Sequence, residues 1–223
     1  MRASVARYLL EAARVDERVF LISGDAGYGV LDEFQQTFPD RFLNLGIAEQ
    51  NTIGLAAGLA LSGFKVFVYN IIPFVLYRCY EQVRNDVCYQ NLPVTLIGTG
   101  SGVAYAPAGM THYAVEDIGL ARTLPGLAVL SPCDPVETRL CMEYAYRNTG
   151  PTYVRIAKGR EPILHDPAPS SVSEPILVAP GEHIAVLFHG SAGGEVMAAI
   201  KELSTSPKVI ALPLLQPLNW EKL

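Results

Sequence analysis

Short apolar runs alternate along the chain with longer segments whose apolar residues recur at helical spacing. The short runs, typical of buried strands, are residues 19–22, 42–45, 66–70, 94–98, 127–130 and 153–156. The segments with helical spacing are 4–15, 49–62, 74–89 and 134–147. This alternation predicts an α/β fold, a mainly parallel sheet with helices on both faces.

Ligands of such sheets bind beyond the carboxyl ends of the strands. The loops that follow the predicted strands are therefore the places to look for chemistry. They are residues 23–29, 46–50, 70–74 and 98–113.

The pattern changes after the sixth strand. Five prolines and a serine cluster lie in residues 161–182, which predicts a linker after a domain of residues 1–160. Residues 183–223 then predict one further strand–helix–strand unit, at 184–188, 194–203 and 209–212. About forty residues are too few for an ordinary independent core.

Composition narrows the class of protein. Half of the 223 residues are hydrophobic and 17% are charged, so apolar surface is left over for a subunit interface. The net charge of −5 argues against a nucleic-acid partner. The apolar stretch 53–76 is interrupted by Gly63, Lys65 and Pro73, which predicts helix, turn and strand rather than a membrane span. Four isolated cysteines and a first segment without a long apolar region predict a cytoplasmic protein.

Glu49 opens a predicted helix directly after a strand, in LGIAEQNTIGLAAGLALSG. A carboxylate there stabilises the positive end of the helix, which is one interpretation. The other is functional. Burial against Ile47, Ala48 and Ile53 favours the protonated carboxyl, which would then share a proton with a ligand nitrogen.

His112 lies in AGMTHYAVED, after a mostly uncharged loop rich in glycine. A loop histidine is often only a surface residue, but this loop is where the fold presents chemistry and histidine titrates near neutrality. Glu116 and Asp117 follow and would orient the imidazole or cap the next helix. Phe74, Tyr77 and Tyr80 recur every three residues, which predicts a helix core stripe or a wall for a planar heterocycle.

Three stretches together resemble the pyrimidine-binding domain of the transketolase family over about residues 1–160. They are FLNLGIAEQNTIGLAAGLALSGFKVFV, PFVLYRCYEQVRNDVCYQNLPV and AGMTHYAVEDIGLARTLPGLAVLSPCDPVE. The end of the chain resembles the opening of that family's C-terminal domain. The resemblance implies an enzyme that uses thiamine diphosphate and transfers a two-carbon unit, with a site formed between two chains.

The resemblance also implies roles for individual residues. Glu49 matches the glutamate that bonds the pyrimidine ring, Phe74 and Tyr77 match the aromatic wall beside it, and Asp25 matches an aspartate near the cofactor. His112 matches a histidine that faces the substrate, and Lys158 stands where transketolases often place an arginine for sugar phosphate.

The departures from the family pattern concern the substrate and the metal. Ala108 replaces an acidic residue and Gly100 replaces a histidine, which predicts a less phosphorylated or less polar substrate, a ketose or a 2-oxo compound. Gly24, Asp25 and Asn51 copy the spacing of the diphosphate and metal motif, but Asn51 belongs to the Glu49 motif. We therefore expect a partner subunit to hold the diphosphate and Mg²⁺, in a heterotetramer or around a homodimerising core.

Two other functions stay open at this point. The chain would be a component similar to deoxyxylulose phosphate synthase or to the β chain of a 2-oxoacid dehydrogenase, or a scaffold subunit without catalysis.

Overall fold

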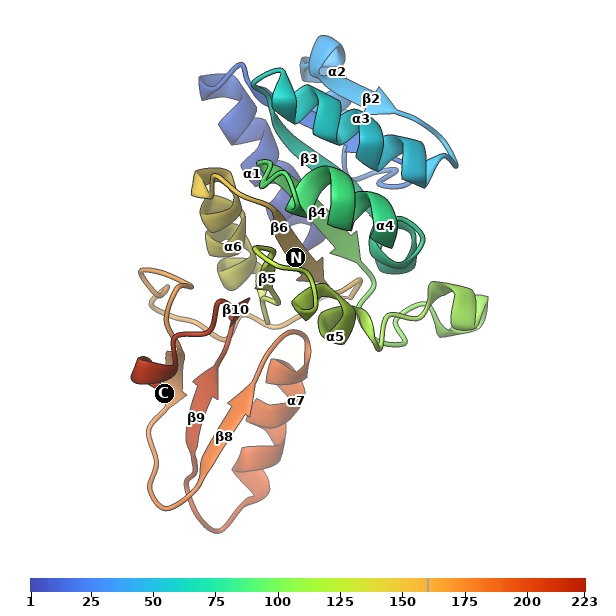
Figure 1. Ribbon diagram of the computed structural model, residues 1–223. Helices are drawn as coiled ribbons and strands as arrows, with labels where there is room; N and C mark the ends of the chain where they lie inside the picture. Colours follow the sequence, from blue (N-terminus) through green and yellow to red (C-terminus); the bar gives the residue numbers. More distant parts are fainter. Residues whose placement is uncertain (160) are drawn as a thin grey trace.

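A computed structural model describes residues 1–159 and 161–223. Its main feature is a seven-stranded sheet in the order β10-β5-β6-β4-β3-β1-β2 (Figure 1). The neighbours from β5 to β2 are parallel, and β10 pairs with β5 in the antiparallel sense. The strands are β1 (Val19–Ser23), β2 (Phe42–Asn44), β3 (Lys65–Ile71), β4 (Val94–Thr99), β5 (Ala128–Leu130), β6 (Thr152–Ile156) and β10 (Leu214–Gln216). The predicted α/β class and mainly parallel sheet are confirmed.

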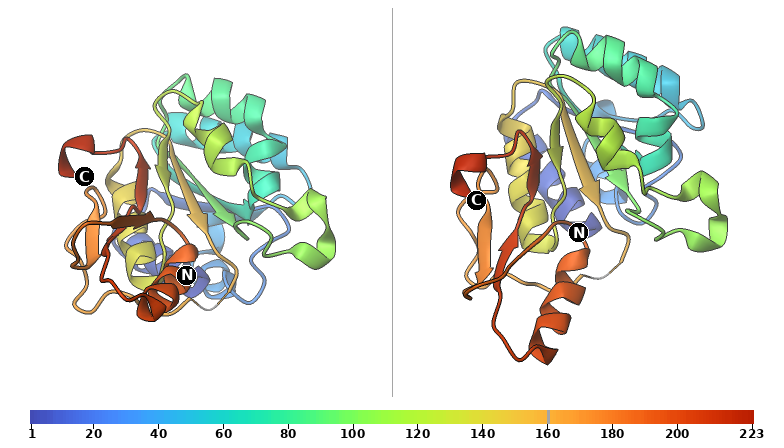
Figure 2. Two further views of the ribbon diagram at one scale, coloured as in Figure 1. Left: turned by 90° about the horizontal axis from the view of Figure 1, so that it is seen from below. Right: turned by 60° about the horizontal axis from the view of Figure 1, so that its bottom comes forward.

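Helices cover both faces of this sheet, as two views show (Figure 2). One core packs α1 (Arg2–Val15) and α6 (Pro135–Arg147) on the sheet, with α2 (Asp32–Thr37) beside α1. The other core packs α3 (Glu49–Leu61), residues 73–92 and α5 (Asp117–Arg122). Alternate strand residues enter the two cores, for example Val66 and Val68 in one and Phe67 and Tyr69 in the other. Short 3₁₀ turns lie at Pro39–Arg41, Ala106–Ala108, Met110–His112, Ile200–Glu202 and Trp220–Lys222.

The segment 74–89, expected as one regular helix, is divided. A π-helical turn at Pro73–Tyr77 precedes α4 (Tyr80–Gln82), and a second π-helical stretch spans Val83–Cys88. The widened turns are closed by bonds five residues apart, such as Arg78 N to Pro73 O at 2.9 Å. A π turn changes the angular position of the side chains that follow it, so the three-residue aromatic spacing does not mark one face.

The C-terminal residues form a second, smaller sheet in the order β7-β9-β8. Its elements are β7 (Ile176–Ala179), β8 (Ala185–Phe188), α7 (Ala192–Ala199) and β9 (Lys208–Ala211). Strand β7 lies inside the expected linker 161–182, because its apolar residues pair with β9. Strand β10 then returns to the main sheet, a connection that the sequence pattern did not predict.

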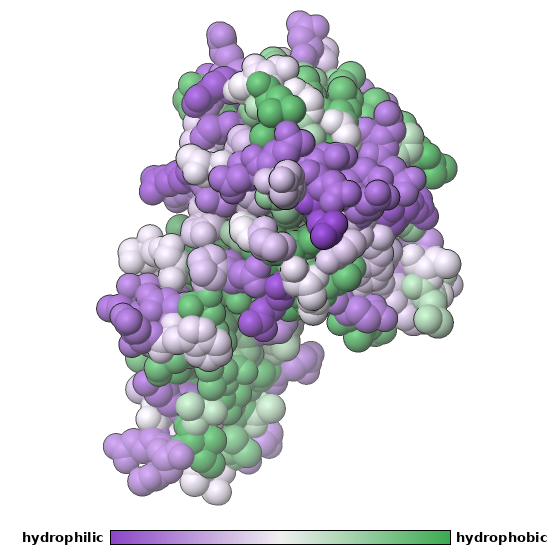
Figure 3. Space-filling model, in the orientation of Figure 1, coloured by the Kyte–Doolittle hydropathy of each residue, from purple (hydrophilic) through white to green (hydrophobic). Residues whose placement is uncertain are grey.

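Apolar side chains remain at the surface of the second sheet. Leu177 and Leu187 flank Ile210 in register across the three strands, and both leucines are largely exposed. The space-filling view shows apolar surface gathered over this lower part of the molecule (Figure 3). Among the described residues, no helix has the length and apolar character needed to cross a membrane.

Candidate functional site

The ends of β1, β3 and β4 bring the predicted loops to one edge of the main sheet. A side chain at Gly24, just after β1, would meet the amide of Asn70 in β3, since its Cβ would lie 2.6 Å from Nδ2. The loop after β4 carries His112, and Glu49 begins α3 after β2. The parallel topology therefore gathers segments that are far apart in the sequence.

Glu49 is 6% exposed and is paired with Arg78, whose Nη1 donates to Oε1 at 2.7 Å. The sequence pattern predicted an apolar environment that favours the protonated carboxyl. This was wrong in part, because Ile47 is 79% exposed and a guanidinium contacts the carboxylate. Arg78 is a residue of the site that the sequence pattern did not reveal. The opposite charge favours the ionised carboxylate in the chain alone.

Phe74 joins Arg78 to His112. The Arg78 guanidinium carbon lies 4.4 Å from the centre of the Phe74 ring, a cation–π contact. The His112 imidazole meets the same ring edge to face, with centres 5.1 Å apart. Glu49, Phe74 and His112, from three separated motifs, therefore belong to one contiguous group.

The His112 imidazole lies among groups of its own loop and of the segment after β6. Its Nδ1 is 2.9 Å from Thr111 Oγ1, and the Tyr105 ring lies 6.1 Å from its own. Lys158 Nζ sits 4.1 Å from the centre of the Tyr105 ring. His112 and Lys158, both predicted from sequence, are thus bridged by Tyr105, which no sequence motif singled out.

Tyr105 also fills the space beside Gly100. Gly100 has φ +89°, and a Cβ there would overlap Cε2 of the Tyr105 ring. A side chain at position 100 is excluded both by backbone conformation and by this ring. The presence of glycine at this position therefore goes together with an aromatic residue from the next loop.

Tyr77 and Asp25 contact other groups than the cluster around Phe74. Tyr77 donates its hydroxyl hydrogen to Glu116 Oε2 at 3.1 Å, and burial together with the nearby Asp117 raises the Tyr77 pKa. Asp25 accepts a hydrogen bond from Tyr28, and its backbone N–H donates to Asn44 Oδ1 at 3.0 Å. The roles that the resemblance gives to these two residues stay predictions.

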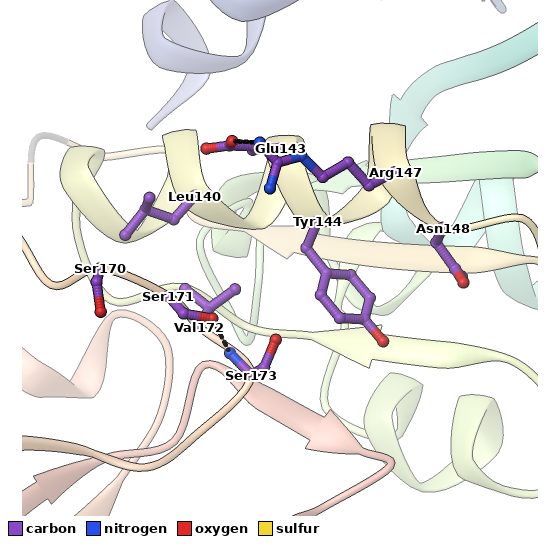
Figure 4. Close-up of a pocket in the computed structure, with 9 residues that line it drawn as sticks. All are labelled: Leu140, Glu143, Tyr144, Arg147, Asn148, Ser170, Ser171, Val172 and Ser173. Atoms are coloured by element: carbon purple, nitrogen blue, oxygen red, sulfur yellow. Dashed lines mark hydrogen bonds and ion pairs between the residues drawn. The ribbon is translucent and has the colours of Figure 1, made fainter.

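Two other features of the structure lie outside this edge. Cys133, Glu137 and His165 form a buried cluster of metal-ligating types at the start of α6, but their polar atoms already bond to one another. A cavity of about 280 Å³ separates α6 from residues 170–173, with the Glu143–Arg147 ion pair at its rim (Figure 4). Neither shares a residue with the group around Glu49.

Comparison with known proteins agrees with this arrangement. Residues 1–162 match the model of the transketolase pyrimidine-binding domain. One of the two subunits of an apulose-4-phosphate transketolase, from Actinobacillus succinogenes, is 34% identical over 223 residues, covering 98% of this chain and 72% of the relative. The corresponding protein from Phocaeicola vulgatus is 38% identical over 166 residues, 74% of this chain and 53% of the relative.

A solved structure described as a split gene transketolase, inactive β4 tetramer, has the same fold. Its TM-score is 0.88 at 28% identity, and the match covers 97% of this chain and 72% of that one. The family match spans most of the chain, and the residues that carried the resemblance meet at one edge of the sheet. This chain belongs to the transketolase family and contains its pyrimidine-binding domain.

Proposed function

We propose that the chain is the pyrimidine-binding subunit of a split transketolase-like enzyme that depends on thiamine diphosphate and transfers a two-carbon ketol unit. The observation that carries the proposal is the contiguous group of Glu49, Phe74 and His112 at the carboxyl edge of the sheet. Two of the relatives are named as single subunits of a transketolase, which supports a division of the enzyme between two chains.

The chemistry of this group fits the aminopyrimidine half of the cofactor. When bound, the cofactor supplies a carbon nucleophile and an electron sink. Glu49 would bond a ring nitrogen and hold the proton between the two, using Oε2 because Arg78 engages Oε1. Phe74 would lie against the ring and exclude water from that bond.

His112 would serve the substrate. Its ring is held between Phe74 and Tyr105, and Nδ1 lies next to Thr111. This leaves Nε2 to bind a substrate oxygen and to hold or release a proton there. Lys158, exposed at the far side of Tyr105, would attract an anionic group of the substrate.

The open side of this edge supports a partner subunit that holds the diphosphate and Mg²⁺. Ile47 and Met110, from two of the site loops, are 79% and 83% exposed. Large apolar side chains exposed around one site are typical of a surface that another polypeptide covers. Among the described residues, the only cluster of metal-ligating types is the one at Cys133, which lies outside the site.

Two classes of substrate are compatible with this chemistry. Gly100 and Ala108 offer no polar side chain, and Tyr105 occupies the space beside Gly100. This favours a substrate with fewer hydroxyl or phosphate contacts than a pentose phosphate. It also favours a second candidate, an enzyme similar to deoxyxylulose phosphate synthase that takes its two-carbon unit from a 2-oxo acid. Release of carbon dioxide from a 2-oxo acid, compared with cleavage of a ketose, distinguishes the two.

The first experiment is native mass spectrometry of the complex isolated from its own source. We expect this chain together with a second chain, thiamine diphosphate and magnesium. Recovery of this chain alone or only self-associated, free of cofactor, would contradict the proposal and favour a scaffold role.

The second experiment is Glu49→Ala in the assembled enzyme. A general acid–base role predicts a loss of about 10²–10⁴ in kcat. Glu33→Ala, an exposed glutamate of α2, is the matched control and should keep the rate. If Glu49→Ala keeps the full rate in an intact complex, the catalytic assignment fails.

A further inference from the structure

The loop that carries His112 has little packing of its own. It leaves β4, forms the two short 3₁₀ turns and projects from the body of the molecule (Figures 1 and 2). Val103 and Met110 in this loop are 58% and 83% exposed. The orientation of His112 therefore depends on how the base of the loop is held.

The base of the loop is a two-residue antiparallel bridge. Gly102 N donates to Ala114 O at 2.9 Å, and Ala114 N donates to Gly102 O at 2.8 Å. Ala114 is fully buried. A third donor reaches this bridge, because Arg155 Nη2 bonds Ala114 O at 3.2 Å.

Arg155 is in turn held by a buried carboxylate. Its Nε donates to Asp117 Oδ2 at 2.7 Å, and the Tyr153 hydroxyl donates to the same oxygen at 2.7 Å. Asp117 is fully buried, and the Arg155 side chain is 11% exposed. Tyr153 and Arg155 come from β6, which is paired on both sides by β4 and β5. The loop base is thus tied to a central strand of the sheet.

A buried ion pair of this kind is a poor source of stability, because well-packed apolar residues at such sites are often as stable or more so. Here Asp117 Oδ1 has no hydrogen-bond partner among the described residues, so the carboxylate uses only one of its oxygens. What the arrangement does provide is direction. One planar guanidinium joins the carboxylate and the carbonyl of Ala114 in a set geometry.

We propose that Asp117, Arg155 and Tyr153 are positioning residues that hold the base of the 102–114 loop and so set the orientation of His112 toward the substrate. This inference rests on the proposed function. Tyr153 and Asp117 act on the loop only through Arg155 and the bridge, and none of the three belongs to the group around Glu49.

Arg155→Lys is the first variant, since it keeps the positive charge and loses the fork that joins the two acceptors. In the enzyme assembled with its own diphosphate-binding subunit, we expect kcat to fall about 10- to 100-fold, the effect of a misplacement near 1 Å. Arg139→Lys is the matched control, because Arg139 makes a 2.7 Å ion pair with Glu11 on another face of the molecule. It should leave kcat unchanged.

A double-mutant cycle separates positioning from general destabilisation. If Arg155 acts through His112, Arg155→Lys has no further effect on kcat in a His112→Ala background. Equal and additive losses in the two backgrounds would overturn the proposal. If His112→Ala alone leaves the rate unchanged, the proposed function of His112 fails instead, and the two failures are distinguished.

Hydrogen–deuterium exchange gives a readout that does not need activity. In the chain alone, Arg155→Lys should raise exchange at the amides of Gly102 and Ala114 and leave the β3 amides unchanged. Tyr153→Phe, which removes one bond to Asp117 and keeps the fold of β6, should raise it less. Unchanged exchange at the loop base in folded Arg155→Lys protein would overturn the proposal.

Discussion

A buried ion pair ties the segment after β6 to the start of α6. His165 Nε2 lies 2.7 Å from Glu137 Oε1, and the two side chains are 5% and 0% exposed. The other carboxylate oxygen of Glu137 accepts the backbone N–H of Cys133 at 2.7 Å. The replacement His165→Leu keeps an apolar side chain in this place and removes the imidazole donor to Oε1.

The expected loss follows from the burial of the partner that is left behind. Breaking a buried pair by removing one member costs about 3–5 kcal/mol, because an uncompensated charge stays in the interior. For a chain of this size, each kcal/mol lowers Tm by about 2–4 °C. His165→Leu should therefore lower Tm by roughly 6–20 °C.

The loss should also depend on pH, with a sign set by the histidine. The hydrogen bond to Glu137 raises the pKa of His165, although burial opposes this. A raised pKa in the folded state gives stability that is fully present below the unfolded value of about 6.5. That stability is lost as the pH rises through the folded value. The gap between the wild type and the variant should be widest near about pH 6 and narrower near about pH 9.

Urea and thermal unfolding at these two pH values measure the gap directly. His183→Leu is the control, since His183 lies 3.8 Å from Glu182 with both side chains about nine-tenths exposed. We expect the control to change stability by less than about 0.5 kcal/mol. A loss below about 1 kcal/mol for His165→Leu, or a gap that does not change with pH, would refute the reasoning.

Two further substitutions follow from single contacts. Gly100→Ala should reduce kcat of the assembled enzyme, because its Cβ would overlap the Tyr105 ring that packs near His112; an unchanged rate in steady-state assays would contradict this. Asp134→Ala should destabilise the chain by about 1–2 kcal/mol in urea unfolding, because Asp134 Oδ1 caps α6 at the N–H of Glu137. The loss should reach the upper end, since Oδ2 also accepts the N–H of Leu164, and a neutral effect would show that the cap is dispensable.

Much of the main sheet was predictable because each strand is a short apolar run. Residues 19–22 and 94–98 were expected as strands and lie in β1 and β4. Their parallel pairing follows from the intervening helices, and the parallel order in turn places the loops of Glu49 and His112 at one edge. The candidate site could therefore be located, to within a set of loops, without any side-chain geometry.

The partners of these residues could not be predicted in the same way. Arg78 reaches Glu49 from 29 positions away, after a π-helical turn that shifts the phase of the side chains. Nothing in the spacing of the aromatic residues signals that shift. The helix was expected to be regular, and the pairing was missed for that reason.

Position 100 shows why single-residue reasoning stops short. In sequence, Gly100 is a residue without a side chain where a polar one was expected. In the structure, its φ of +89° and the Tyr105 ring make glycine a requirement, and the same ring lies between His112 and Lys158. The glycine and the tyrosine are thus one change rather than two, made across the loop that follows β4. Its consequence is to replace a polar contact by an aromatic surface at the point where the two predicted substrate residues approach each other.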